Sequence, residues 1–188
     1  MKIGFAFCGS FCTFAPAMTE LKRLADSGHE VVPIMSFNAS SIDTRFGAAK
    51  EHIEKIEALC GRHVIKTIED AEPLGPKEKL DMLIICPCTG NTLAKLALGV
   101  TDTPVTMAAK AHLRGDRPLL IALATNDGLS ANLSNLNAMQ KRKSAYFVPL
   151  RQDDPEMKPH SLVCDFGKLT DAFYAALRQE QLRPLFLN

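Results

Sequence analysis

The chain has 188 residues, of which 46% are hydrophobic and 23% are charged, and its 22 basic and 21 acidic residues give a formal net charge of +1. This length predicts one domain spanning residues 1–188, and the composition excludes disordered, collagen-like and coiled-coil chains. Nucleic-acid binding is not expected as the main activity, since no basic excess is present to neutralise phosphates. No membrane association is expected either, because the apolar stretches fall short of the roughly 20 residues of a membrane span.

The first part of the chain alternates between short apolar runs and segments with helical spacing. Residues 2–8 and 30–36 predict two strands buried on both faces, because their apolar residues do not alternate with polar ones. Pro33 removes one hydrogen-bond donor from the second strand, which favours a position near a sheet edge or a local irregularity. Helical spacing over residues 14–27 predicts a helix between the two strands, with Gly28 as its C-cap.

A second helix is predicted over residues 45–60, where a helical period brings four apolar side chains to one inward face. Those side chains are Phe46, Ile53, Ile56 and Leu59, and Gly61 would end the helix. Further strands are predicted over residues 81–86, 118–124 and 146–148, and further helices over residues 93–98, 105–113, 129–143 and 165–178. Residues 151–161 lack periodicity and are rich in Pro, Asp and Gln, which predicts a mobile loop.

This alternation of strands and helices predicts an α/β fold with a parallel sheet covered on both faces, a single-domain, three-layer, doubly wound architecture of the Rossmann-like type. Ligands of such folds bind beyond the carboxyl ends of the strands, where the strand order reverses. The loops that follow the predicted strands are therefore the candidate site. They cover residues 9–13, 36–44, 87–92 and 125–130.

The first of these loops reads Gly9-Ser10-Phe11-Cys12-Thr13. Glycine allows a close approach of the backbone to a ligand, and the helix that follows presents free N–H groups and a positive dipole end. The segment lacks the G-x-G-x-x-G pattern of dinucleotide-binding proteins and the Walker pattern. The loop thus favours the phosphate of a mononucleotide or another small anion, with a plain capped turn as the alternative.

The third loop carries the most distinctive motif of the chain. It reads CPCTGNTLAKLALGVTD from residue 86, and Thr125-Asn126 follows the next predicted strand. The segment resembles the P-A-S-A-N-T-x-A-K-x-A-x-G-x-x-D motif of homo-oligomeric flavin-containing cysteine decarboxylases, and flavin prenyltransferases carry a related P-C-S-x-x-T version. The resemblance spans nearly the whole chain in element order and implies the flavoprotein type of fold.

This resemblance implies FMN as a cofactor, with phosphate or another small anion as the alternative occupant of the same pocket. It also implies a homo-oligomer, a trimer or a dodecamer. The implied cofactor-binding residues are Gly9, Ser10, Phe11, Thr13, Ser36, Asn38, Pro87, Thr89, Gly90, Asn91, Thr92, Thr125 and Asn126.

Two departures from that family separate its fold from its chemistry. Residues 69–80 contain no His, although phosphopantothenoylcysteine decarboxylases carry a catalytic His before the corresponding strand. Thr125-Asn126-Asp127 stands where prenyltransferases carry an Arg-Glu pair. The fold and an anion pocket are therefore expected here without the decarboxylase or prenyltransferase chemistry.

Three longer blocks are similar to the family of dipicolinate synthase B subunits. They are GFAFCGSFCTF, ICPCTGNTLAKLALGVTDTPVTMAAKAHLR and ATNDGLSANLSNLNAM. The resemblance implies an oxidoreductase chain that works with a separate NAD(P)-binding partner, the dipicolinate synthase A subunit, to oxidise dihydrodipicolinate to pyridine-2,6-dicarboxylate in the mother-cell cytoplasm during sporulation. Two alternatives are a stand-alone FMN-dependent decarboxylase and a non-catalytic scaffold subunit with an anion pocket.

The same loops supply candidates for catalysis on a dicarboxylate ring. Asn91 and Asn126 can each donate and accept hydrogen bonds, which suits a planar ligand. Ring oxidation needs a base, and Asp127 is the candidate, with Asn126 beside it.

Three groups of polar residues have simpler interpretations. Cys8, Cys12, Cys86 and Cys88 follow neighbouring strands, but their spacing is not that of a zinc ribbon. No metal site is expected, and the six cysteines are expected to be free thiols in a reducing cytoplasm. His112 lies in a basic helix end that suits the helix dipole. A last group, Asn132, Asn135 and Asn137, would face solvent or line a subunit contact.

Overall fold

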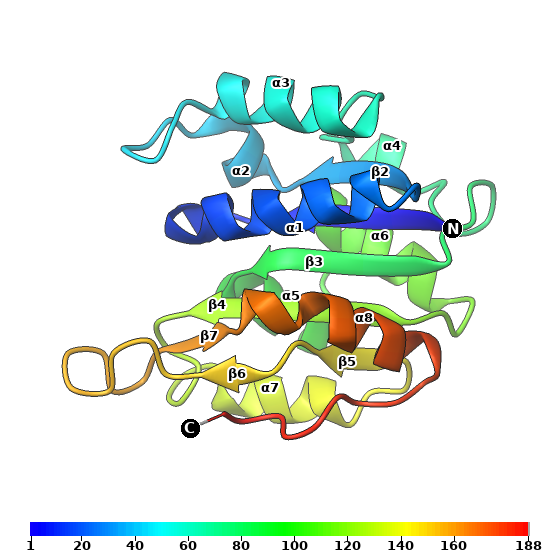
Figure 1. Ribbon diagram of the computed structural model, residues 1–188. Helices are drawn as coiled ribbons and strands as arrows, with labels where there is room; N and C mark the ends of the chain where they lie inside the picture. Colours follow the sequence, from blue (N-terminus) through cyan, green and yellow to red (C-terminus); the bar gives the residue numbers. More distant parts are fainter. Residues whose placement is uncertain (188) are drawn as a thin grey trace.

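The computed structural model describes residues 1–187 of the chain, which form a sheet of seven strands with helices on both faces (Figure 1). The strands are β1 Lys2–Phe7, β2 Glu30–Met35, β3 Met82–Cys88, β4 Leu119–Thr125, β5 Ala145–Phe147, β6 Leu150–Arg151 and β7 Leu162–Cys164. Their order in the sheet is β2-β1-β3-β4-β7-β6, and β5 also pairs with β4.

The centre of the sheet is parallel, as the sequence predicted. β1 pairs in parallel with β2 on one side and with β3 on the other, and β4 pairs in parallel with β3 and β5. Every residue of β3 is buried, which explains the absence of alternation in its sequence. The chain crosses from one side of β1 to the other before β3, so the strand order reverses between β1 and β3.

The sheet also contains an antiparallel part, which the sequence did not predict. β7 pairs antiparallel with the end of β4, where Ala124 faces Val163 and Thr125 faces Leu162, and β6 pairs antiparallel with β7. β5 pairs only with Leu119–Ile121 of β4 and leaves the rest of that edge to β7. The predicted loop over residues 151–161 therefore connects two short antiparallel strands.

The helices form the two outer layers. They are α1 Phe14–Asp26, α2 Phe37–Ser41, α3 Ala49–Cys60, α4 Ile68–Ala71, α5 Gly90–Leu98, α6 Pro104–Leu113, α7 Leu133–Gln140 and α8 Leu169–Leu177, with 3-10 turns at Phe11–Thr13 and Phe166–Lys168. Figure 1 shows α1 and α8 in front of the sheet and α5, α6 and α7 behind it. The predicted three-layer fold is thus confirmed.

Several helix starts differ from the sequence prediction. α3 begins at Ala49, four residues later than expected, because residues 44–47 form a turn closed by two hydrogen bonds between Thr44 and Gly47. Phe46 therefore lies outside the helix with 44% of its surface exposed, which contradicts its predicted inward position. α7 begins at Leu133 instead of residue 129, because a polar turn occupies the residues before it. The short α2, capped by Ser36, was not predicted.

Two sequence expectations about the sheet edge and the helix ends are confirmed. β2 ends the sheet on its side, as Pro33 predicted, and only an isolated bridge from Ile34 to Ile65 extends it. Gly61 ends α3 with a left-handed φ of 65°. Among the described residues, no helix combines the length and the apolar character that crossing a membrane would need.

Candidate functional site

A pocket of about 760 Å³ opens where β1, β3 and β4 end. It therefore lies at the reversal of strand order, as the fold predicted. The turn over residues 44–47 and the loop over residues 151–161 project past the sheet on this same side (Figure 1). The predicted site residues that line it are Gly9, Ser10, Phe11, Thr13, Thr89, Gly90, Asn91, Thr125, Asn126 and Asp127.

The turn after β1 forms one wall of the pocket. The backbone N–H of Thr13 donates to the carbonyl of Ser10 at 3.0 Å, and the Thr13 hydroxyl donates to the same carbonyl at 2.8 Å. These bonds wind residues 11–13 into a 3-10 turn that leads directly into α1. The first turn of this segment contains no acidic side chain, so its N–H groups present positive potential to the pocket.

The start of α5 forms a second wall. Thr89 is its N-cap, and the Thr89 hydroxyl accepts a hydrogen bond from the backbone N–H of Thr92 at 3.2 Å. The N–H groups of Gly90 and Asn91 lie in the first helical turn, where no carbonyl of the helix can accept from them. Both residues line the pocket, and this first turn also lacks acidic residues. The arrangement suits an anion.

A polar network closes the third wall, after β4. One oxygen of the Asp127 carboxylate accepts from the Thr125 hydroxyl at 2.5 Å, and the other accepts from the Asn132 amide at 2.8 Å. Asn135 in turn donates to the amide oxygen of Asn132 at 3.0 Å. Asn132 is buried, which contradicts its predicted solvent or subunit-facing position. It acts instead as an anchor for the site loop.

Gly90 connects this network to α5. A Cβ at Gly90 would lie 2.5 Å from the Asn132 amide nitrogen, 2.5 Å from the Thr125 hydroxyl and 2.8 Å from an Asp127 oxygen. Real Cβ contacts do not become this short. The motif therefore places glycine at this position because the polar network after β4 packs directly against the helix start.

Four predicted site residues do not line the pocket. Thr92 is buried behind the first turn of α5 and donates to the Cys8 thiol at 3.3 Å. Pro87 lies inside β3, and its carbonyl accepts from the N–H of Cys8 at 3.1 Å. Ser36 is buried as the N-cap of α2, and Asn38 is exposed next to Gly9. These four residues therefore lie outside the pocket lining.

Several lining residues were not among the predicted site residues. Those that lie on the two loops beside the pocket and carry polar or aromatic side chains are Arg45, Phe46, Asp153, Lys158 and Ser161. The Arg45 guanidinium lies 4.9 Å from the centre of the Phe46 ring, a cation–π distance. Only the proximity of their loops to the predicted edge could have identified these residues, because neither loop carries a motif.

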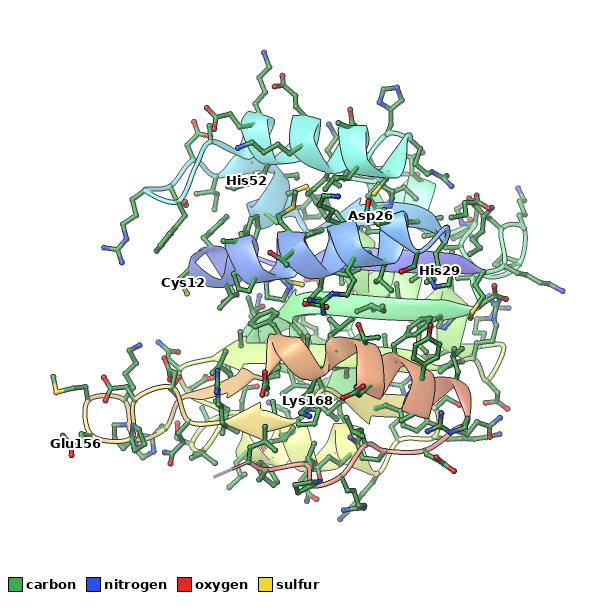
Figure 2. The ribbon with its side chains drawn as sticks, in the orientation of Figure 1. Cys12, Asp26, His29, His52, Glu156 and Lys168 are labelled. Carbon is green, nitrogen blue, oxygen red and sulfur yellow. The ribbon has the colours of Figure 1, made fainter. Side chains whose placement is uncertain are left out.

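Polar contacts join parts of the loop over residues 151–161 to one another and to the end of β4. Lys158 forms an ion pair with Asp153 at 2.8 Å, and the Ser161 hydroxyl donates to the carbonyl of Thr125 at 3.2 Å. The hydrogen bond from Lys158 holds the pKa of the Asp153 carboxyl below its usual range, and the same bond raises the pKa of Lys158. Figure 2 shows Glu156 at the tip of this loop, on the side of the sheet where Cys12 lies.

Most cysteines are packing residues. Cys8, Cys86, Cys88 and Cys164 are buried, while Cys12 is exposed at the pocket. Burial raises the pKa of Cys8 to about 11, so its thiol stays protonated at neutral pH. Within residues 1–187, no group of three or more His, Cys, Asp or Glu side chains is arranged to hold a metal ion.

Comparisons with known proteins agree with this geometry. The family model described as "Flavoprotein" matches residues 1–177. The chain is 43% identical to the dipicolinate synthase B subunit of Bacillus subtilis (strain 168) over 187 residues, covering 100% of this chain and 94% of that protein.

Two solved structures have similar folds. The crystal structure of the dipicolinate synthase B subunit from Bacillus halodurans superposes with a TM-score of 0.91 at 37% identity, covering 100% of this chain and 96% of that one. A dodecameric FMN-dependent UbiX-like decarboxylase from Escherichia coli O157:H7 superposes with a TM-score of 0.62 at 24% identity, covering 79% of this chain and 80% of that one. The second similarity shows the shared fold alone.

Proposed function

Because the chain belongs to the flavoprotein family, and because it matches a dipicolinate synthase B subunit along its whole length, we propose that it acts as the B-type subunit of such a synthase. The full-length identity of 43% is the observation that carries this proposal. The reaction would be the oxidation of dihydrodipicolinate to pyridine-2,6-dicarboxylate during sporulation, in the mother cell.

The proposed reaction removes a hydride and a proton from the ring, and the hydride needs an acceptor. This chain carries no G-x-G-x-x-G pattern. A separate NAD(P)-binding partner, the A-type chain of the synthase, would therefore supply a nicotinamide that accepts the hydride. The division of labour leaves this chain to bind the substrate, to orient it and to accept the proton.

Two side chains of the pocket suit the two carboxylates of the substrate. Arg45 and Lys158 are the lining cations, and they lie on the turn over residues 44–47 and the loop over residues 151–161. Charge-assisted hydrogen bonds to carboxylates are stronger than neutral ones. We assign one carboxylate to each of these two loops, with the N–H groups of Gly90 and Asn91 as further donors.

The same walls fit a flavin. Backbone N–H groups and the Ser10 hydroxyl are donors that suit a phosphate, and Phe11 and Phe46 offer apolar surface to a ring. When bound, FMN supplies a two-electron acceptor. The alternative occupant of this part of the pocket is phosphate or another small anion.

Asp127 is the proposed base, with Asn126 as its neighbour in the pocket. Its two oxygens accept from Thr125 and Asn132, so the carboxylate has a defined orientation. A carboxylate held in this way can accept a proton from a ligand in the pocket, which is the task of a general base. The proton taken from the ring would reach this carboxylate directly or through one water.

The proposal is tested by reconstitution. The purified partner chain is assayed for formation of pyridine-2,6-dicarboxylate with and without this protein, and each mixture is measured with and without added FMN. We expect product only when both chains are present. Full activity of the partner alone would overturn the proposal. A rate that depends on FMN would support flavin in the pocket, and an FMN-independent rate would leave the anion as its occupant.

A homo-oligomer, a trimer or a dodecamer, is part of the same proposal. Phe37, Ile42 and Phe46 are large apolar side chains with 45%, 43% and 44% of their surface exposed. They lie on α2 and on the segment that follows it, beside the pocket. Apolar surface gathered in this way is typical of contacts between subunits.

A further inference from the structure

A second cavity lies at the opposite edge of the sheet, where the strands begin. It has a volume of about 350 Å³, and its lining residues lie on the segment before β3, on the end of α6 and on the segment that joins α6 to β4. Three of its lining residues are cations, Lys79, Arg114 and Arg117, and none of its lining residues is acidic. The volume is at the lower end of the range for small-molecule sites.

The positive charge of this cavity is not neutralised by the acids next to it in sequence. Glu78 forms ion pairs with Lys2 at 2.9 Å and with Arg62 at 3.0 Å, and these partners hold its pKa below the usual range. Asp116 pairs with Lys143 at 2.7 Å, and Asp81 accepts from the backbone N–H of Lys2 at 2.8 Å. Each of these three acids thus has another partner among the described residues.

Arg117 is held in place as a fixed part of this cavity. Its guanidinium donates to the carbonyl of Leu80 at 3.1 Å and to that of Gly75 at 3.4 Å, so it joins the segments before β3 and β4. A guanidinium has five N–H donors, and these two bonds leave three of them. Its Nε is buried beside Gly115 and has no hydrogen-bond partner among the described residues.

The buried histidine beneath this edge adds no charge to the cavity. Burial lowers the pKa of His112 to about 4, and the charge of Arg117 acts in the same direction. His112 is therefore neutral at physiological pH. Three cations that share a cavity repel one another, and an anion that binds among them removes this repulsion.

We propose that Lys79, Arg114 and Arg117 form a second anion site, separate from the pocket at the carboxyl edge. Its ligand is a small oxyanion with about two negative charges, and free phosphate and a dicarboxylate such as the proposed product share this chemistry. Arg117 supplies a fixed fork of donors, while the exposed Lys79 and Arg114 supply mobile charges.

The test uses the full chain and inorganic phosphate in a chloride buffer at constant ionic strength, with dipicolinate as a second titrant. Binding is measured by calorimetry, and hydrogen exchange over residues 75–80 and 111–117 locates it. The variant Lys79→Gln with Arg114→Gln removes two cations and leaves Arg117 in its structural role. The matched control, Lys77→Gln with Lys110→Gln, removes two exposed cations that do not line the cavity, one from the segment before β3 and one from α6.

We expect the first variant to bind phosphate at least about tenfold more weakly and to lose the protection of both segments from hydrogen exchange. The control should bind phosphate like the unmodified chain. Protection by dipicolinate but not by phosphate would assign the site to dicarboxylates, and the reverse would assign it to phosphate. Equal binding by both variants, or no protection by either titrant, would overturn the proposal. Loss of partner binding in the first variant without any anion binding would also overturn it, because the cations would then belong to a protein interface.

Discussion

Gly90 is the residue at which the walls of the carboxyl-edge pocket come closest together. Replacing Gly90 with Ala would place a Cβ 2.5 Å from the Thr125 hydroxyl and from the Asn132 amide. We expect the free energy of unfolding to fall by about 1–3 kcal/mol, because the Asp127 network must move. Urea unfolding measures this change. Asn91→Ala, at the exposed next position, should alter stability by less than about 0.5 kcal/mol, and equal losses in both variants would contradict the packing argument.

Asp127 and Asn132 have different proposed roles: Asp127 accepts the proton, and Asn132 holds the Asp127 carboxylate in place. If Asp127 accepts the ring proton, Asp127→Asn should reduce kcat by about 100-fold or more, because an amide cannot take up that proton. Asn132→Ala removes one donor but keeps the carboxylate, so it should lower stability by about 1–2 kcal/mol and reduce kcat much less. The kcat of the reconstituted synthase and urea unfolding of the chain measure these two effects. An unchanged rate in Asp127→Ala, Asn91→Ala and Asn126→Ala with intact assembly would favour the scaffold alternative.

Lys158 tests the assignment of the substrate carboxylates. Lys158→Ala should weaken binding of dipicolinate about tenfold and leave stability nearly unchanged, because the side chain is exposed. Asp153→Asn should strengthen binding, since the competing carboxylate is removed. The control is Lys168→Ala, which breaks a similar exposed pair with Asp171 away from the pocket. Equal effects of the two lysine variants on calorimetric binding would contradict the assignment.

The site residues that the sequence could predict belong to short motifs directly after a strand. Thr89, Gly90, Asn91 and Thr125 fall into this class, because parallel strands bring their carboxyl ends to one edge. Arg45 and Lys158 could not be predicted, since they reach the pocket on loops whose path depends on the tertiary fold. Asn132 was predicted to lie on a helix surface because the sequence does not show that α7 begins only at Leu133, the residue after it.

His112 connects two elements, α6 and β4. Its ring nitrogen lies 2.8 Å from the carbonyl of Pro118, and burial lowers its pKa to about 4. The unfolded chain binds this proton near pH 6.5, whereas the folded chain does not until about pH 4. The contribution of neutral His112 to the free energy of unfolding is therefore complete above pH 6.5 and is lost as the pH falls toward 4. The total loss is about 3 kcal/mol.

The measurement is urea unfolding across about pH 4–7. His112→Gln can keep a donor to Pro118, and its stability should fall less steeply between pH 6.5 and 4 than that of the unmodified chain. Parallel slopes would show that His112 does not remain neutral. The basic helix end predicted from the sequence is thus a buried polar link, and the sequence could not show this because burial follows from the packing of α6 on the sheet.

Long apolar elements were predictable, and short or polar ones were not. β1, β3 and β4 have continuous apolar sequences that identify them. β6 and β7 have two and three residues, too few for a periodic signal. α2 depends on the cap at Ser36, and a single hydroxyl before five residues is a weak pattern.

The whole molecule is expected to assemble through the apolar side chains beside the pocket. Light scattering of the purified chain should give a mass that is a multiple of the monomer. The double change Phe37→Ser and Ile42→Ser should lower that mass, while Tyr174→Ser, a similarly exposed position on α8, should not. A monomeric mass for the unmodified chain would contradict the proposed oligomer.

The overall architecture could be predicted from the alternation of strands and helices, but the antiparallel end of the sheet could not. A right-handed crossover rule and buried strands were enough to place the ligand edge. The antiparallel return through β7 required knowledge of how far β5 extends along β4, and three residues of sequence at Ala145–Phe147 do not encode that length.

The division of the β4 edge between β5 and β7 also bears on aggregation. An unpaired strand edge is a template on which another chain can add a strand. β5 and β7 occupy the two ends of this edge, and at the other side of the sheet Pro33 removes one donor from the outer edge of β2 and the bridge to Ile65 covers part of it. Copies of this protein are therefore expected to meet through side chains and not by adding strands at these two edges.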